Sequence, residues 1–131
     1  MDRLVFETHP ERLAIARLAP EAAVPPWCGG AWTTVSRTRA ELSVICAQAV
    51  VPSEVRQERD KIAIGIVGVV PMTTVGLLAS LCRALADKSV PVFVVSTYDT
   101  DWLLVSVENH AKAKSALEDL GHEVRGACPA T

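Results

Sequence analysis

The stretch VPVFVVSTYDTDWLLVSV, residues 90–107, decides how this chain can fold. Two apolar runs, residues 92–95 and 102–105, flank a short polar segment. Both runs are β-branched, aromatic or aliphatic and are too short for a helix, so the stretch predicts a β-hairpin. Its tip holds two Asp, two Thr, a Ser and a Tyr, which is more hydrogen-bonding capacity than a turn requires.

The chain before this hairpin predicts a strand followed by a helix. The run IAIGIVGVV, residues 62–70, is apolar at almost every position, as in a central strand that is covered on both faces. Pro71 should end this strand. Leucines recur on one face up to about Lys88, which predicts a helix, and Thr73 or Thr74 is the expected N-cap.

The chain after the hairpin predicts a second helix and a last strand. Asn109 is suited to cap this helix, and Gly121 is the expected C-terminal stop. Residues 122–125 then form a short strand. The resulting order, β-α-β-β-α-β, is the split βαβ arrangement of ferredoxin-like domains, so we expect the α+β class.

The first half of the chain predicts short strands without a long helix. The expected strands are residues 13–18, 32–36 and 42–46. Three prolines and two glycines in residues 20–30 exclude a regular helix there, and Pro52 is suited at best to a short helical turn. The charged run RQERDK, residues 56–61, is interpreted as a solvated connection at a boundary. We therefore expect a domain at residues 1–58 and another at residues 59–131.

A weak repeat relates the two halves. Residues 35–45 can be laid over residues 95–105 at an offset of sixty, so that both segments open with Val-Ser. An acid, Glu41 or Asp101, then precedes each second strand. The overlay suggests a duplicated unit whose first copy is degraded.

Composition excludes several function classes. Half of the 131 residues are apolar and about a fifth are charged, which is typical of a globular protein. A formal charge of −2 gives no broad basic surface, so we expect neither nucleic acid nor an anionic membrane as a partner. The N-terminus lacks the apolar core of a signal peptide, and no apolar run approaches the ~20 residues that span a bilayer.

The reactive side chains are scattered. The four cysteines lie too far apart in sequence for a metal knuckle, so we expect free thiols and a cytoplasmic location. The three histidines belong to no motif, and no glycine-rich phosphate loop follows a strand. Asp99 and Asp101 supply too few oxygen ligands for a divalent-ion site. We expect no catalytic residues, no metal and no cofactor.

Three segments carry a family resemblance. Residues 94–105, VVSTYDTDWLLV, resemble the VSTYDTDYLLV signature of small tandem-ACT proteins. Residues 32–46, WTTVSRTRAELSVIC, are similar to the first-repeat pattern FFSITRTPDELSIVC of that family, and residues 71–81 resemble its strand-to-helix stretch. This is the ACT type of the CASTOR arginine sensors and of many short bacterial proteins. The segments agree in order and spacing over most of residues 11–125.

The resemblance implies two ACT subdomains in tandem, each with an antiparallel sheet and helices on one face. It also implies that an amino acid binds at a subdomain or subunit interface, between a loop and the hairpin. The residues carried over are Val70, Pro71, Met72, Thr73 and Thr74 in the loop and Ser96, Thr97, Tyr98, Asp99 and Asp101 in the hairpin. Relatives often place an acid after the loop proline, and this chain has none there.

Physical chemistry supports the same site. An amino acid needs donors for its carboxylate and acceptors for its ammonium group. The N–H groups of a helix N-terminus, expected at residues 73–75, supply the donors, and Asp99 or Asp101 supplies the acceptor. The alternative is that both acids only cap the turn, while Thr97 and Thr100 only satisfy its backbone.

Two functions follow from these alternatives. The first is a regulatory sensor of a free amino acid or similar metabolite, which acts through a protein partner or through a homodimer. The second is a dimerisation or interaction module that is independent of ligand and has a vestigial site. Neither function is enzymatic.

Overall fold

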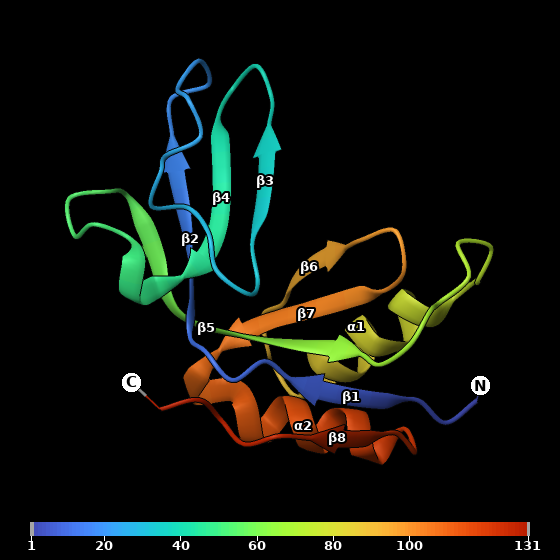
Figure 1. Ribbon diagram of the computed structural model, residues 1–131. Coiled ribbons are helices and arrows are strands. Elements are labelled where there is room, and N and C mark those ends of the chain that lie inside the picture. The colour runs from blue at the N-terminus through green and yellow to red at the C-terminus, as the bar shows by residue number, and fades with distance from the viewer. Residues whose placement is uncertain (1, 131) are drawn as a thin grey trace. The chain divides into compact units, whose positions relative to one another are not determined.

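A computed structural model describes residues 2–130, which divide into two compact units (Figure 1). The N-terminal unit comprises residues 11–61 together with Ala130, and the C-terminal unit comprises residues 2–10 and 62–129. The division falls inside one strand, β5 (Gln57–Ile66). The predicted boundary at residue 58 lies in the same strand, but residues 2–10 belong to the C-terminal unit. That the first 58 residues are a degenerate ACT subdomain stays a prediction.

The C-terminal unit has the predicted order of elements. Its elements are β1 (Val5–Thr8), the second half of β5, α1 (Leu77–Asp87), β6 (Phe93–Ser96), β7 (Asp101–Ser106), the 3-10 turn η2 (Val107–Asn109), α2 (His110–Asp119) and β8 (Glu123–Arg125). The strands lie in the order β6-β7-β5-β1-β8. The β-α-β-β-α-β order from β5 to β8 is therefore confirmed, and with it the α+β class.

Strand β1 was not predicted. It pairs antiparallel with β5, where Phe6 faces Ile66, and parallel with β8, where Phe6 faces Val124. Its residues alternate between more and less buried, with Phe6 and Thr8 buried. In the sequence this short alternation is not joined to a hairpin or helix signal, and β1 is defined by its two pairing partners.

Both helices of the C-terminal unit cover one face of its strands. Alternate residues of β5 point to the same face, and three of them share a core with the buried stripes of both helices. This core includes Ile62, Ile64 and Ile66 from β5, Leu81 and Leu85 from α1, and Ala113, Ala116 and Leu117 from α2. The predicted placement of helices on one face is thus confirmed for this unit. No helix among the described residues is long and apolar enough to cross a membrane.

The N-terminal unit consists of strands. It contains β2 (Leu13–Leu18), β3 (Thr34–Arg37), β4 (Leu42–Ala47), the 3-10 turn η1 (Gln48–Val50) and the first half of β5. The order is β3-β4-β2-β5, and all pairs are antiparallel. Three predicted strands are confirmed to within two residues, and residues 51–55 form turns. The described residues of this unit contain no α-helix.

The charged run at residues 56–61 is not the solvated connection that the sequence predicted. Residues 57–61 extend β5, and Glu58 pairs with Ile15 of β2. Within this unit β5 is an edge strand, so charged side chains can point to solvent while the backbone pairs. Asp60 has a left-handed backbone (φ 58°). Its N–H donates to Oε1 of Gln48 at 2.7 Å, and its carboxylate accepts from Arg12 at 3.1 Å.

The two hairpins have equivalent turns. In the β3–β4 turn the N–H of Thr38 donates to the carbonyl of Glu41 at 2.9 Å, and in the β6–β7 turn the N–H of Thr97 donates to the carbonyl of Thr100 at 2.8 Å. Four residues separate the last strand pair in each hairpin. Thr38 is therefore equivalent to Thr97, which shifts the predicted overlay by one residue.

Candidate functional site

Residues 67–76, called here the 67–76 segment, connect β5 to α1 and are tied to the β6–β7 turn. The N–H of Val70 donates to the carbonyl of Asp99 at 2.6 Å. The hydroxyl of Thr100 donates to the carbonyl of Ile66 at 2.9 Å, just before the segment begins. These two bonds place the segment beside the hairpin turn, as the family resemblance implied.

Helix α1 begins later than predicted. Its first residue is Leu77, and Gly76 occupies the N-cap position with a left-handed backbone (φ 84°) and no side-chain cap. Thr74 instead closes a turn, since its N–H donates to the carbonyl of Pro71 at 3.0 Å. The expectation that Thr73 or Thr74 caps the helix is therefore wrong. Only glycine adopts this backbone at little cost, so the chain bends at Gly76 rather than at a threonine.

A pocket of about 360 Å³ lies between the 67–76 segment, the hairpin turn and the start of α1. We call it the loop–hairpin pocket. Eight of the ten predicted site residues line it, namely Val70, Pro71, Met72, Thr74, Ser96, Thr97, Tyr98 and Asp101. Its remaining lining residues are Gly76, Leu77, Leu78, Ala79 and Thr100. The structure thus gathers most of the predicted residues around one cavity.

Two predicted residues do not line the pocket. Thr73 is exposed, and Asp99 accepts a hydrogen bond from the N–H of Val70 through its backbone carbonyl. The residues that the sequence reasoning missed belong mainly to the first turn of α1. Gly76 was the available signal for them, because a glycine before an apolar helical stripe can mark the helix start.

Asp101 is the acidic group of the pocket. Its Oδ1 accepts a hydrogen bond from the hydroxyl of Ser96 at 2.6 Å, between paired positions at the ends of β6 and β7. A carboxylate has about four acceptor sites, so this bond leaves capacity for a further donor. Among the residues that line the pocket, Tyr98 is the only other side chain with an ionisable group.

The hydroxyl of Thr97 is used by the turn itself, and that of Thr100 joins the turn to β5. The hydroxyl of Thr97 contacts both the carbonyl and the N–H of Thr100, and that of Thr100 reaches Ile66. Thr97 thus has the structural role that the sequence left open for it, whereas the Thr100 hydroxyl bonds β5 instead of the turn. These bonds leave Asp101 as the stronger candidate for a ligand contact.

The first turn of α1 supplies backbone donors to the same pocket. The N–H groups of Leu77, Leu78 and Ala79 have no partner within the helix, because each lies fewer than four residues from its start. The helix dipole adds partial positive charge at this end. The donors expected at residues 73–75 are therefore found a few residues later in the chain.

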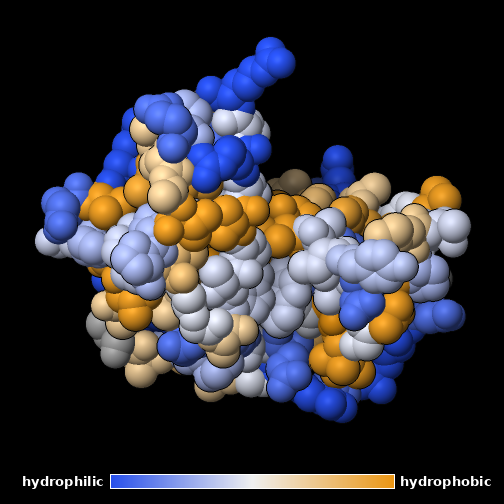
Figure 2. All heavy atoms as spheres, turned by 45° about the horizontal axis from the view of Figure 1, so that its top comes forward, coloured by the Kyte–Doolittle hydropathy of each residue, from blue (hydrophilic) through white to orange (hydrophobic). Residues whose placement is uncertain are grey.

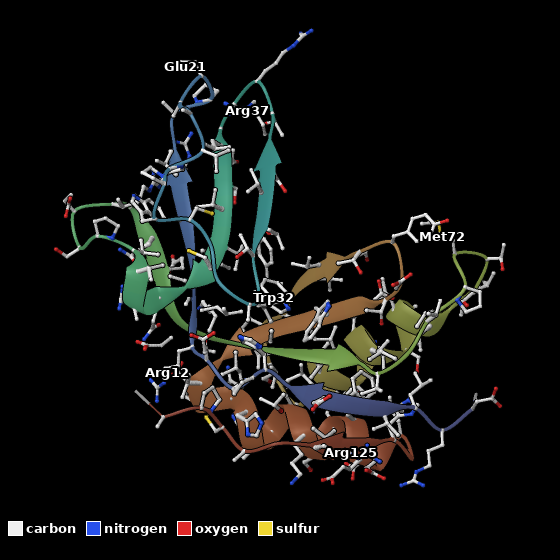
Figure 3. The ribbon with its side chains drawn as sticks, viewed as in Figure 1. Arg12, Glu21, Trp32, Arg37, Met72 and Arg125 are labelled. Atoms are coloured by element: carbon white, nitrogen blue, oxygen red, sulfur yellow. The ribbon has the colours of Figure 1, made fainter. Side chains whose placement is uncertain are left out.

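Apolar side chains form the exposed rim of the pocket. Met72 is 74% exposed and Tyr98 is 83% exposed, and Figure 3 shows Met72 on the 67–76 segment. Apolar surface is visible toward the right of Figure 2, the end where this segment lies in Figure 1. The segment also borders a second cavity of about 490 Å³. Exposed apolar groups of this kind are typical of surfaces that bind a ligand or a partner.

The pocket combines a carboxylate, a helix N-terminus and apolar walls. It can accept a molecule that carries an ammonium group and a carboxylate close together. Its lining residues include no histidine, cysteine or lysine. Among residues 2–130, no cluster of three or more His, Cys, Asp or Glu side chains is arranged to hold a metal ion.

Comparison with known protein families supports the fold. The model of the ACT domain family matches residues 56–119. Residues 56–119 are an ACT domain. The match contains the 67–76 segment, the hairpin and both helices, so the loop–hairpin pocket lies within the ACT domain. A second family model, which describes an N-terminal domain, matches residues 11–54.

Solved structures resemble most or all of the chain. An X-ray structure of a protein from Agobacterium tumefaciens is 28% identical, with a TM-score of 0.90 over 100% of this chain and 99% of that one. A Vibrio cholerae protein of unknown function, described as a possible transport protein, is 16% identical, with a TM-score of 0.70 over 88% of each chain. The ligand-free regulatory subunit of aspartate kinase from Thermus thermophilus is 12% identical, with a TM-score of 0.59 over 87% of this chain and 95% of that subunit.

The last two similarities show a shared fold. No curated protein matched the chain in sequence. A regulatory, small-molecule-binding role is the class of function that the ACT domain match supports.

Proposed function

We propose that this ACT-domain protein is a non-catalytic sensor of a free amino acid or a similar small metabolite. The ligand binds in the loop–hairpin pocket, and its occupancy changes how the protein associates with a second copy or with a partner protein. The proposal rests on one observation. Asp101, the first turn of α1 and the apolar 67–76 segment line the same cavity.

The two charged ends of an amino acid find complementary groups in this pocket. The ammonium group binds the carboxylate of Asp101 in a charge-assisted hydrogen bond. The carboxylate lies at the first turn of α1, where backbone N–H groups and the helix dipole favour an anion. A cavity of about 360 Å³ is within the range of small-molecule sites.

Ligand binding would connect the 67–76 segment to the hairpin turn, which few hydrogen bonds otherwise join. The 67–76 segment is tied to the hairpin turn by the bond from Val70 to Asp99. A ligand that touches both the segment and the turn would order the rim that Met72 and Tyr98 form. Because this rim is exposed and apolar, a second copy or a partner protein can bind it. The affinity of that association then depends on whether the rim is ordered. The proposal includes a homodimer and a cytoplasmic location.

A thermal-shift screen of the purified protein against each standard amino acid at millimolar concentration tests the proposal. One or a few amino acids should raise the melting temperature, because a ligand that binds only the folded state stabilises it by RT ln(1 + [L]/Kd). Asp101→Asn should abolish the shift. Asp99→Asn is the matched control, since Asp99 lies in the same turn and its side chain does not line the pocket. No shift with any amino acid would contradict the proposal that the ligand is a free amino acid.

A second function is favoured by the exposed apolar residues near the pocket. Val75 is 95% exposed and Val69 is 73% exposed, beside Met72. A ligand-independent interaction module would use this surface for dimerisation and leave the pocket vestigial. Sedimentation velocity across a range of protein concentrations, with and without amino acids, separates the two functions. A dimer that is indifferent to every amino acid would favour the second one.

A further inference from the structure

We infer that the loop–hairpin pocket selects amino acids with an uncharged, apolar side chain over basic and acidic ones. This inference rests on the proposed function, and it names the class of ligand that the site takes. It follows from the charges that line the pocket and from the positions of its apolar walls.

A basic side chain finds no partner of its own. Asp101 is the only acid among the lining residues, and the ammonium group of any amino acid ligand requires it. The other acid of the turn, Asp99, lies outside the pocket. The residues that follow Pro71 are Met72 and two threonines, so this part of the wall carries no carboxylate. An unpaired ammonium or guanidinium would then lose hydration without compensation.

An acidic side chain meets the same difficulty with the opposite sign. No lysine, arginine or histidine is among the lining residues. The donors at the first turn of α1 serve the main carboxylate of the ligand. A second carboxylate would lie near Asp101 or against apolar groups, and both positions are unfavourable.

Apolar residues of the 67–76 segment and of α1 form one part of the remaining wall, and hydroxyl-bearing residues form the other. Val70, Pro71 and Met72 come from the 67–76 segment, and Leu77 and Leu78 come from α1. Leu77 is buried and packs into the core, so this side of the pocket is fixed. Met72 is unbranched and exposed, so it can adjust to side chains of different shape. Aliphatic side chains such as those of leucine, isoleucine, valine and methionine fit this wall.

Calorimetric titration of the purified protein with leucine, isoleucine, valine, methionine, lysine, arginine, aspartate and glutamate tests the inference. At least one aliphatic amino acid should bind about tenfold or more tightly than each charged one, which corresponds to about 1.4 kcal/mol. If lysine, arginine, aspartate or glutamate binds as tightly as the best aliphatic ligand, the inference is wrong while the proposed function stands. If no amino acid binds, the proposal of an amino-acid ligand fails and the inference fails with it.

A designed variant tests the role of the wall separately. Met72→Glu places a carboxylate beside the apolar wall, so it should weaken binding of the aliphatic ligand and make lysine or arginine binding detectable. Val75→Glu is the matched control, because Val75 belongs to the same segment and does not line this pocket. Circular dichroism should show that both variants are folded. An unchanged preference in Met72→Glu, or the same change in Val75→Glu, would overturn the assignment of the wall.

Discussion

A Cβ atom added to Gly65 of β5 would lie 2.5 Å from Cε3 of Trp102 on the neighbouring strand β7. The indole ring therefore occupies the space that any other residue at position 65 would need. The glycine in the apolar run of β5 has a packing reason, because it admits the Trp102 side chain next to the strand that leads to the pocket.

Gly65→Ala should consequently destabilise the protein. The added methyl group forces the indole or the strand to move, which typically costs about 1–3 kcal/mol. Urea denaturation followed by tryptophan fluorescence measures the change. Gly29→Ala is the control, since its added Cβ has no atom within 4 Å and its backbone is not left-handed. Equal stability of the two variants would show that the Trp102 side chain leaves room for a Cβ atom at position 65.

A second prediction concerns the dependence of stability on pH. Nδ1 of His122 accepts a hydrogen bond from the N–H of Leu4 at 3.0 Å, so the ring proton of the neutral form is on Nε2. His122 is only 5% exposed, and burial lowers its pKa below the ordinary value of histidine. Burial also lowers the pKa of His110. Protonation of His122 would remove the acceptor that holds the chain just before β1.

The direction of the pH effect follows from these shifts. When folding lowers the pKa of a histidine, the unfolded chain binds more protons, so stability is full above the unfolded pKa of about 6.5 and declines as the pH falls below it. The urea midpoint should therefore decrease between pH 7.5 and pH 5.5. His122→Asn keeps an acceptor near the Nδ1 position and cannot be protonated, so its midpoint should depend less on pH. An unchanged pH dependence would assign the effect to other groups, such as His110.

The cysteines give a third prediction. Cys46 is fully buried, and burial, followed by the effect of nearby Cys28, raises the pKa of its thiol. Cys128 is exposed. Because the thiolate is the reactive form, iodoacetamide should label Cys128 first and Cys46 only when the N-terminal unit unfolds. Peptide mass spectrometry after timed labelling reads this order. Early labelling of Cys46 in the native protein would contradict its placement in the core.

Much of the ACT domain could be predicted because its signals are local. The hairpin strands, the leucine stripe of α1 and the stop at Gly121 each depend on a few neighbouring residues, and Gly121 does have a left-handed backbone (φ 96°). The gathering of Met72 and Asp101 at one pocket followed from family resemblance together with the order of elements. Whether these residues bind a ligand stays a prediction.

The features that the sequence did not predict depend on pairing between distant segments. Strand β1 forms because its backbone pairs with β5 on one side and with β8 on the other. Residues 57–61 form a strand because β2 pairs with them, although their charges are typical of a solvated loop. The start of α1 was predicted too early because two threonines, which are good N-cap residues, precede Gly76. In the structure the N–H of Thr74 closes a turn instead.

A last prediction joins stability to ligand binding at Gly76. Its left-handed backbone (φ 84°) lies at the N-cap of α1 and in the wall of the pocket, and an added Cβ would meet no atom within 4 Å. The cost of Gly76→Ala is therefore conformational, about 1–2 kcal/mol. The first turn of α1 should shift, and the affinity for the amino acid should fall with the stability. Gly76→Asn is the control, because asparagine tolerates this backbone better. Urea denaturation and calorimetric titration of both variants measure the two effects, and a Gly76→Ala variant with full affinity would show that the first turn does not contact the ligand.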